Sequence, residues 1–195
     1  MTNKFAGIGY SDLMCERGRA LGATDTFERS RASVGVWERV AVNDESTAAK
    51  IERPIGHYHS LHTDRIENMD TYEREDTAEE ISCELWRLCE FNALTPKRIL
   101  VVGLGNERLA PDALGPLAAK EIEATMHLYE EAPELFEALE CTQIAVIRPG
   151  VRAESGLDAK DAVSALCSTV NPDLVIAIDA LCTTSEDRLG TTFQL

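Results

Sequence analysis

Hydrophobic positions occur along the chain in two patterns, and each pattern predicts a type of element. The runs "RILVVGL" (98–104) and "LVIAIDAL" (174–181) contain almost no polar residue, which is typical of central strands buried on both faces of a sheet. The run "QIAVI" (143–147) predicts a third strand, and "TTFQL" (191–195) is a candidate for a fourth. We expect these strands to form the main sheet.

Helical spacing of apolar residues fills the stretches between the strands. Thr77 and Glu80 have the spacing of a capping box, and the apolar positions that follow predict a helix from about Thr77 to Asn92. Two further apolar stripes predict helices over 117–128 and 158–170. Strands that alternate with helices indicate an α/β fold with a largely parallel sheet and helices on both faces.

The N-terminal part of the chain lacks this alternation. Residues 1 to about 35 are rich in Gly, Arg, Ser and Thr, so we expect a weakly ordered leader there. The segments "VGVWERVA" (34–41) and "PIGHYHSLHT" (54–63) have enough alternation to be strands. They predict a small β layer before the main sheet.

Length, composition and charge restrict the classes of protein. The chain has 195 residues, of which 44% are hydrophobic and 27% charged, so we expect one globular domain with a sizeable core. No run resembles a targeting signal or approaches the roughly 18 apolar residues of a membrane helix, and we expect a cytoplasmic location. The net charge of -15 argues against direct binding to nucleic acid. The six cysteines form no Cys-x-x-Cys pair and are expected to be free: Cys15, Cys83, Cys89, Cys141, Cys167 and Cys182.

Two acids follow predicted strands and are the candidates for catalysis. Asp112 comes after the first core strand and a glycine-containing turn, and Asp179 stands near the end of the most apolar strand. In an open parallel sheet the functional groups gather at the carboxyl ends of the strands. We expect burial to push Asp179 towards the protonated form, and the start of a helix near Pro111 or Pro116 to hold Asp112 ionised. Such a pair suits general acid and base catalysis on water.

A purely structural interpretation of the two acids is also open. Asp112 would then be only a helix cap, and Asp179 would accept backbone hydrogen bonds from a neighbouring turn. The spacing of the residues alone does not decide between the two interpretations.

The glycine loop that precedes Asp112 is suited to close backbone contacts. Gly103 and Gly105 have the first two positions of a dinucleotide-binding loop, but Arg108 replaces its third glycine, so we expect no cofactor. The glycines permit positive φ and close approach. Asn106 can hold the loop or contact a substrate amide.

The histidine-rich segment "HYHSLHTD" has a spacing that could hold a metal ion. On a strand, however, His57 and His59 share one face while His62 points to the other, so we favour a β segment without metal. No Gly-x-Ser-x-Gly elbow or recognisable cysteine nucleophile is present.

Four stretches carry a resemblance to a known family. "ILVVGLGNERLAPDALGP", "IRPGV" (147–151), "NPDLVIAIDAL" and "DRLGTTFQL" together resemble the germination protease of endospore-forming bacteria. The resemblance is strongest from Ile99 to Leu195. The same glycine loop and aspartates are more distantly similar to the hydrogenase maturation endopeptidases.

The resemblance implies a fold, an activity and a site. The fold is a three-layer α/β/α sandwich of the phosphorylase/hydrolase-like type. The activity is an endopeptidase that starts the degradation of small acid-soluble spore proteins in the spore core during germination. The family's proposed catalytic acids correspond to Asp112 and Asp179, one as base to water and one as acid to the leaving amine.

The family is also made as a zymogen, assembles as a tetramer, and continues well past the position of Leu195. The resemblance therefore implies a leader over 1–23, a processing region at Ala23, Thr24 and Asp25, and the N-terminal part of a protease domain over 24–195. Ala23 stands where the family usually has arginine, and Thr26 where it has leucine. A hydrogenase-maturation-like endopeptidase, which metal-dependent activity would reveal, and an inactive binding module of the same fold remain the alternatives.

Overall fold

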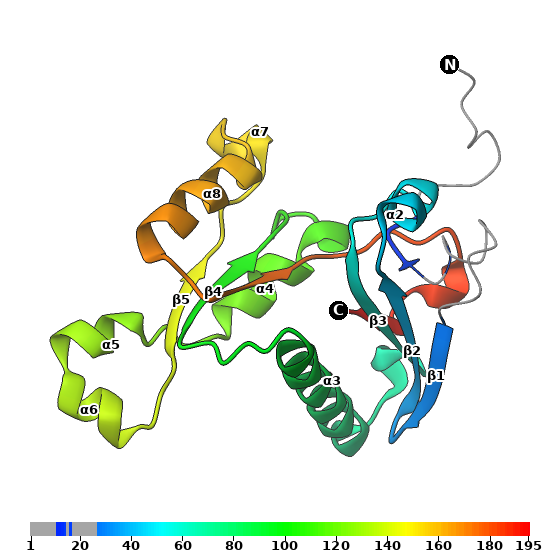
Figure 1. Cartoon of the computed structure of the whole chain (residues 1–195), viewed down its shortest axis with the longest axis horizontal. Helices are drawn as coiled ribbons and strands as arrows, with labels where there is room; N and C mark the ends of the chain where they lie inside the picture. Colours follow the sequence, from blue (N-terminus) through cyan, green and yellow to red (C-terminus); the bar gives the residue numbers. More distant parts are fainter. Residues whose placement is uncertain (1–10, 15, 17–26) are drawn as a thin grey trace. The chain divides into compact units, whose positions relative to one another are not determined.

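The structure is a computed structural model that describes residues 11–14, 16 and 27–195. The chain divides into two compact units, the first formed by Met1–Asn92 with Leu181–Leu195 and the second by Ala93–Ala180. Figure 1 labels most of the helices and strands of both units. No helix in the described part of the chain combines the length and apolar character needed to cross a membrane.

The first unit contains a four-stranded antiparallel sheet with the order β1-β2-β3-β7. Its strands are β1 (Phe27–Ala32), β2 (Gly35–Val42), β3 (Gly56–Thr63) and β7 (Thr192–Gln194). The predicted small β layer is therefore confirmed by β2 and β3. The prediction of a weakly ordered leader is wrong for β1, which pairs with β2 along its whole length, and for residues 11–14, three of which are buried.

The last strand, β7, does not join the parallel sheet as its sequence predicted. It pairs with β3 in the antiparallel sheet, where Phe193 lies opposite Leu61. The reason is visible in its alternation, because Thr192 and Gln194 flank the single apolar residue, as in a strand with one polar face. The Gln194 side chain uses that face to accept a hydrogen bond from the Met14 N–H at 2.7 Å.

The helices of the first unit are α2 (Glu45–Ile51) and the 21-residue α3 (Thr71–Phe91), with the 3-10 turns η1 (Ile66–Asn68) and η3 (Glu186–Arg188). The predicted helix exists, but its predicted start at Thr77 is wrong. Asp70 caps α3 and Glu73 completes the capping box, while the Thr77 hydroxyl donates to the Glu73 carbonyl inside the helix. The first turns of α3 are rich in charged residues and have no apolar stripe, so the hydrophobic pattern of the sequence does not predict them.

The face of α3 that packs on the sheet is unusually polar. Glu84 is 3% exposed and accepts two hydrogen bonds from the Arg39 guanidinium, at 2.5 and 2.7 Å. His59 is 2% exposed, and its Nδ1 lies 2.6 Å from Glu84 Oε1 without an aligned hydrogen bond. Burial lowers the pKa of His59 although Glu84 opposes this. Burial alone would raise the pKa of Glu84, but Arg39 and His59 outweigh it and hold the pKa below its ordinary value.

The second unit is a parallel sheet with the order β5-β4-β6, flanked by helices. All three predicted core strands are confirmed: β4 (Arg98–Gly103), β5 (Gln143–Ile147) and β6 (Leu174–Ile178). The helical elements are η2 (Ala110–Asp112), α4 (Leu114–Lys120), α5 (Met126–Glu131), α6 (Pro133–Ala138), α7 (Arg152–Ser155) and α8 (Ala159–Val170). The protein is thus the predicted α/β sandwich with an additional antiparallel sheet.

The strand order creates a switch point at the carboxyl ends of β4 and β5. The chain leaves β4 towards β5 on one side and then returns past β4 to reach β6 on the other. Right-handed crossovers in opposite directions place α4 and α8 on opposite faces, as Figure 1 draws them. The loops after β4 and β5 therefore diverge, which opens a crevice where ligands bind in open parallel sheets.

The single helix predicted over 117–128 is wrong, because α4 and α5 are separate helices. Thr125 interrupts the helix by bonding to the sheet: its N–H donates to the Ile144 carbonyl at 2.9 Å, and its hydroxyl accepts from the Ile144 N–H at 3.0 Å. The helix predicted over 158–170 is confirmed as α8, with Asp158 as its N-cap.

Candidate active site

The loop after β4 turns sharply because two glycines permit close backbone contacts. Gly105 has a φ of +114°, and a Cβ there would lie 2.1 Å from the Asp112 carbonyl oxygen. A Cβ on Gly103 would lie 2.4 Å from the Gly115 carbonyl oxygen and 2.7 Å from Ala119 Cβ. Helix α4 therefore packs directly against the end of β4. The loop between them folds back so that Gly105 lies against Asp112.

Asn106 fixes the Asp112 carboxyl group through its backbone. The Asn106 N–H donates to the Asp112 carbonyl oxygen at 3.0 Å and to Asp112 Oδ2 at 2.9 Å. The Asn106 side chain holds the loop, since its Oδ1 accepts from the Arg108 N–H at 2.9 Å. Asp112 is half-buried, and α4 begins two residues later without any side-chain cap. The interpretation of Asp112 as only a helix cap is therefore wrong.

Gly115 places the first turn of α4 against the ends of two strands at once. A Cβ on Gly115 would lie 2.2 Å from the Leu104 carbonyl oxygen and 2.2 Å from that of Ile178. The two strand ends are also joined directly, because the Leu104 N–H donates to the Ile178 carbonyl at 2.8 Å. Asp112 precedes Gly115 by three residues and Asp179 follows Ile178, so both acids lie at the carboxyl edge of the sheet.

The environment of Asp179 differs from the one that its sequence suggested. Strand β6 ends at Ile178, and Asp179 lies beyond it as an exposed residue. Its Oδ1 accepts a hydrogen bond from the Ala180 N–H at 2.8 Å. The expected burial of Asp179 is therefore wrong: the apolar run stops one residue too early to enclose the carboxyl group.

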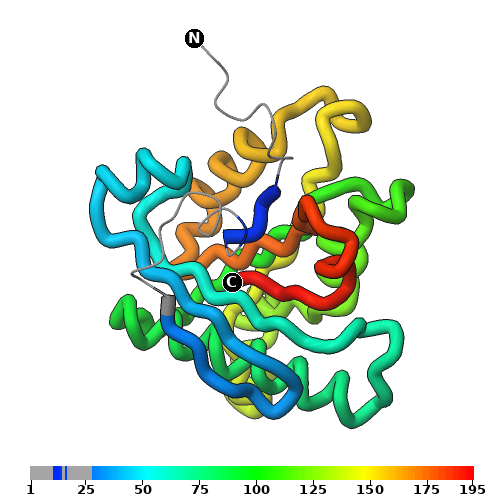
Figure 2. The backbone as a smooth tube through the Cα atoms, turned by 90° about the vertical axis from the view of Figure 1, so that its right-hand side faces the viewer, coloured from blue at the N-terminus to red at the C-terminus, as the bar shows by residue number. Residues whose placement is uncertain are grey.

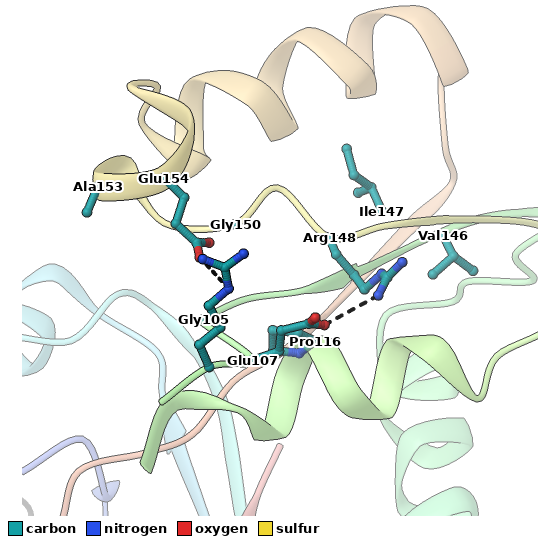
Figure 3. Close-up of a pocket in the computed structure, with 10 residues that line it drawn as sticks. Gly105, Glu107, Pro116, Val146, Ile147, Arg148, Gly150, Ala153 and Glu154 are labelled. Carbon is teal, nitrogen blue, oxygen red and sulfur yellow. Dashed lines mark ion pairs between the residues drawn. The ribbon is translucent and has the colours of Figure 1, made fainter. Parts of the chain in front are cut away.

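A pocket of about 720 Å³ lies beside the glycine loop, at the switch point between β4 and β5. Figure 3 shows its lining, with residues of the loop facing residues from the end of β5 and from α7. The lining residues are Gly105, Glu107, Arg108, Pro116, Val146, Ile147, Arg148, Gly150, Ala153 and Glu154. Gly105 is thus shared between this pocket and the loop that holds Asp112.

Ion pairs cross the pocket between its two walls. Arg108 faces Glu154 at 3.9 Å, and Arg148 faces Glu107 at 3.6 Å (Figure 3). Lys120 lies closer to Glu107, at 2.6 Å, and its hydrogen bond is the main reason that the pKa of Glu107 is lowered. At this wider spacing neither arginine is held in a close ion pair, so both guanidinium groups can exchange partners.

Sequence reasoning on individual residues missed the charged walls of this pocket. The signal was nevertheless available, because Ile147, Arg148 and Gly150 belong to the "IRPGV" stretch that carries the family resemblance. In the sequence, Arg108 stands out only because it replaces the third glycine of a dinucleotide-binding loop.

The remaining candidate residues lie on β3 of the first unit or outside the residues that the structure describes. On β3, the His57 and His59 rings share one face with their centroids 6.1 Å apart, and His62 bonds to Glu38 on the other, as predicted. Within residues 11–14, 16 and 27–195, no cluster of three or more His, Cys, Asp or Glu is arranged to hold a metal. All described cysteines are free. Cys15 and the processing region Ala23, Thr24 and Asp25 lie outside the described residues.

Fold and site together define a class of protein. It is an α/β protein whose glycine-rich loop and polar pocket lie at the carboxyl edge of a parallel sheet, the usual ligand-binding position of such folds. Comparison with known sequences identifies the family: the model of the germination protease family matches residues 19–195. The chain therefore belongs to the germination protease family, as its four motifs predicted.

Individual relatives agree with this assignment. Germination proteases from Bacillus cereus and Bacillus cytotoxicus are each 34% identical to this chain over 178 and 176 residues, which cover 89% of this chain and 47% of each relative. The germination protease of Oceanobacillus iheyensis is 33% identical over 153 residues, covering 78% of this chain and 41% of the relative. The chain spans about half the length of the curated relatives it matches.

Replacing Gly115 by alanine tests the close approach on which the site depends. The added Cβ would overlap two carbonyl oxygens of the strand ends, so we expect a loss of about 3 kcal/mol in the free energy of unfolding. Gly156→Ala, in the same unit, has nothing near its Cβ and only a φ of +74° to oppose it, so about 1 kcal/mol is expected. Urea unfolding measures both, and equal losses would contradict the role of Gly115.

Proposed function

We propose that Asp112 and Asp179 are the catalytic pair of an endopeptidase that cleaves small acid-soluble spore proteins. Membership of the germination protease family supports the activity and the setting in the spore core. The single observation that carries the assignment of the site is the contact of Gly115 with both strand ends, because it brings the loop of Asp112 and the end of β6 to one edge. No cofactor enters the proposal.

The chemistry assigned to the pair is hydrolysis of a peptide bond by water. One carboxylate removes a proton from the water as the water oxygen bonds to the peptide carbonyl carbon. The other carboxyl group delivers a proton to the nitrogen as the C–N bond breaks, which releases an amine and a carboxylic acid. The two acids exchange protons as a coupled pair, so the base and acid roles belong to the pair.

The pocket supplies the place where the peptide would lie. Gly105 and Gly150 leave backbone exposed at its walls, and an extended peptide beside the loop would pass Asp112. In this proposal the leader is cut in the region 23–25, and the complete enzyme assembles as a tetramer.

The test is cleavage of a purified small acid-soluble spore protein, followed by intact-mass analysis of the products. Two proteins are assayed, the 195-residue chain and the same chain extended by the C-terminal half of the Bacillus cereus relative. We expect a small number of defined cuts, with full activity in the presence of a chelator. Absence of cuts with both proteins would refute the proposal, and activity that requires a metal would favour a hydrogenase-maturation-like enzyme.

A further inference from the structure

The N-terminal segment of the first unit, Ser11–Glu16, whose described residues are 11–14 and 16, is held as a ligand would be held. Figure 2 shows its described part, in dark blue, beside the red C-terminal end of the chain. Of its described residues, Met14 and Glu16 are helical, and its hydrogen bonds reach residues at least 41 positions away, apart from two made by its own Ser11.

One apolar side chain anchors the segment in the core. Met14 is 1% exposed and packs in a cluster with Val40, Val42 and Ile51. Leu13 beside it is 3% exposed. A buried methionine of this kind fills the space between apolar neighbours, as the anchor residue of a bound peptide does.

Backbone groups of Asp12 and Cys182 join the segment to the C-terminal part of the first unit. The Asp12 N–H donates to the Cys182 carbonyl at 2.9 Å, and the Cys182 N–H donates back to Asp12 Oδ2 at 3.1 Å. The Arg53 guanidinium donates to the Asp12 carbonyl at 2.9 Å. Hydrogen bonds to main-chain groups contribute affinity when proteins recognise peptides.

Glu16 closes the other end of the contact. Its carboxylate accepts from the Thr183 hydroxyl at 2.8 Å and from the Thr184 hydroxyl and N–H at 2.9 and 3.2 Å. Burial alone would raise the pKa of Glu16, and the hydrogen bonds from Ser11, Thr183 and Thr184 more than reverse this, so that the pKa is lowered. The surface that holds the segment, formed by Arg53, Cys182, Thr183, Thr184 and Gln194, therefore offers hydrogen-bond donors to a carboxylate at this position.

We propose that this surface is a peptide-binding site whose natural ligand is the chain's own segment Ser11–Glu16. It recognises a methionine, an aspartate two positions before it and a glutamate two positions after it. The site binds the segment whether or not the peptide bonds that follow it are intact. This inference does not depend on the proteolytic function, and it places a second ligand site in the first unit, outside the catalytic pair.

The test uses the complete chain with a recognition site for a specific protease introduced within residues 17–26. The protein is folded first, cut afterwards and analysed by gel filtration with circular dichroism. We expect the N-terminal fragment to stay bound to the rest of the protein, called the body here, and to elute with it at micromolar concentration. Release of the fragment, whether or not the body stays folded, would overturn the proposal.

Variants of the segment and of the surface that holds it show whether the retained fragment occupies this site. In dilution experiments we expect Met14→Ala to raise the Kd by at least about 30-fold, because a buried side chain is lost. Thr183→Val should raise it by about 10-fold, with a less than additive effect when combined with Glu16→Gln. Thr191→Val is the matched control, since its hydroxyl donates to the Asp187 carbonyl, and it should leave the Kd unchanged. A Kd that is insensitive to Met14→Ala contradicts the assignment.

Discussion

Replacing Asp112 or Asp179 by asparagine lowers kcat/KM for cleavage of a small acid-soluble spore protein by about 10²- to 10⁴-fold. The amide has the shape of the carboxyl group but neither takes a proton from water nor gives one to the leaving amine. The Asn106 N–H can still donate to the amide oxygen of the Asp112→Asn variant, so the loop keeps its conformation. The rate of product formation by intact mass measures the loss.

Two controls separate chemistry from folding in this experiment. Asp76→Asn changes an exposed acid on α3, and it should leave both the rate and the urea midpoint unchanged. The double variant of Asp112 and Asp179 should be little slower than either single variant, because the two acids act in one reaction step. Normal turnover by either single variant would remove that residue from the proposed pair.

Replacing Glu84 by glutamine lowers the free energy of unfolding of the first unit by about 3–5 kcal/mol, because Arg39 is left buried without its counter-ion. Glutamine keeps the size of the side chain, so the loss measures charge and hydrogen bonding rather than a cavity. Glu79→Gln, exposed on the same helix, is the control and should change stability by less than about 0.5 kcal/mol. Urea unfolding at pH 7.5 gives both values.

The pH dependence of the same variant checks the cause. The folded-state pKa of Glu84 lies below 4.5, so its stabilising contribution is complete above pH 4.5 and is lost as the pH falls through the folded-state pKa. The folded-state pKa of His59 lies below 6.5, so acidification below 6.5 also favours the unfolded state, which binds the proton more readily. The difference between wild type and Glu84→Gln should therefore shrink below pH 4.5. A difference that is constant with pH would point to packing instead.

The second unit could be predicted well because its core strands carry their own signal. The residues of β4 are apolar at nearly every position, and its buried centre, Leu100 to Val102, is at most 4% exposed. Continuous apolar runs of this kind have few alternatives to a central strand. The position of Asp112 after the glycine turn followed from the same pattern, because the carboxyl end of a strand is fixed once the strand is known.

The elements that were missed depend on contacts with other segments of the chain. Nothing in "FERSRA" predicts β1, which forms because β2 offers it a complete set of pairing partners. Thr125 stands between α4 and α5 and is bonded to Ile144 on β5, and no local propensity encodes that contact. Asp179 is exposed because β6 ends before it, a boundary that an apolar run cannot define. The charged pocket could not be predicted without the fold, because Arg108 and Arg148 line the same pocket only when β4 and β5 are adjacent.

The arrangement of the first unit in the sequence has a consequence for how the protein is made. Strand β3 pairs with β7, whose residues follow it by about 130 positions, and the whole second unit lies between them in the chain. During synthesis, the second unit emerges and can collapse on its own local contacts before β3 meets its last partner. Closing so long a loop is slow, so maturation of the antiparallel sheet is expected to be the late step in biogenesis, and the nascent chain must keep the open edge of β3 from pairing elsewhere until then.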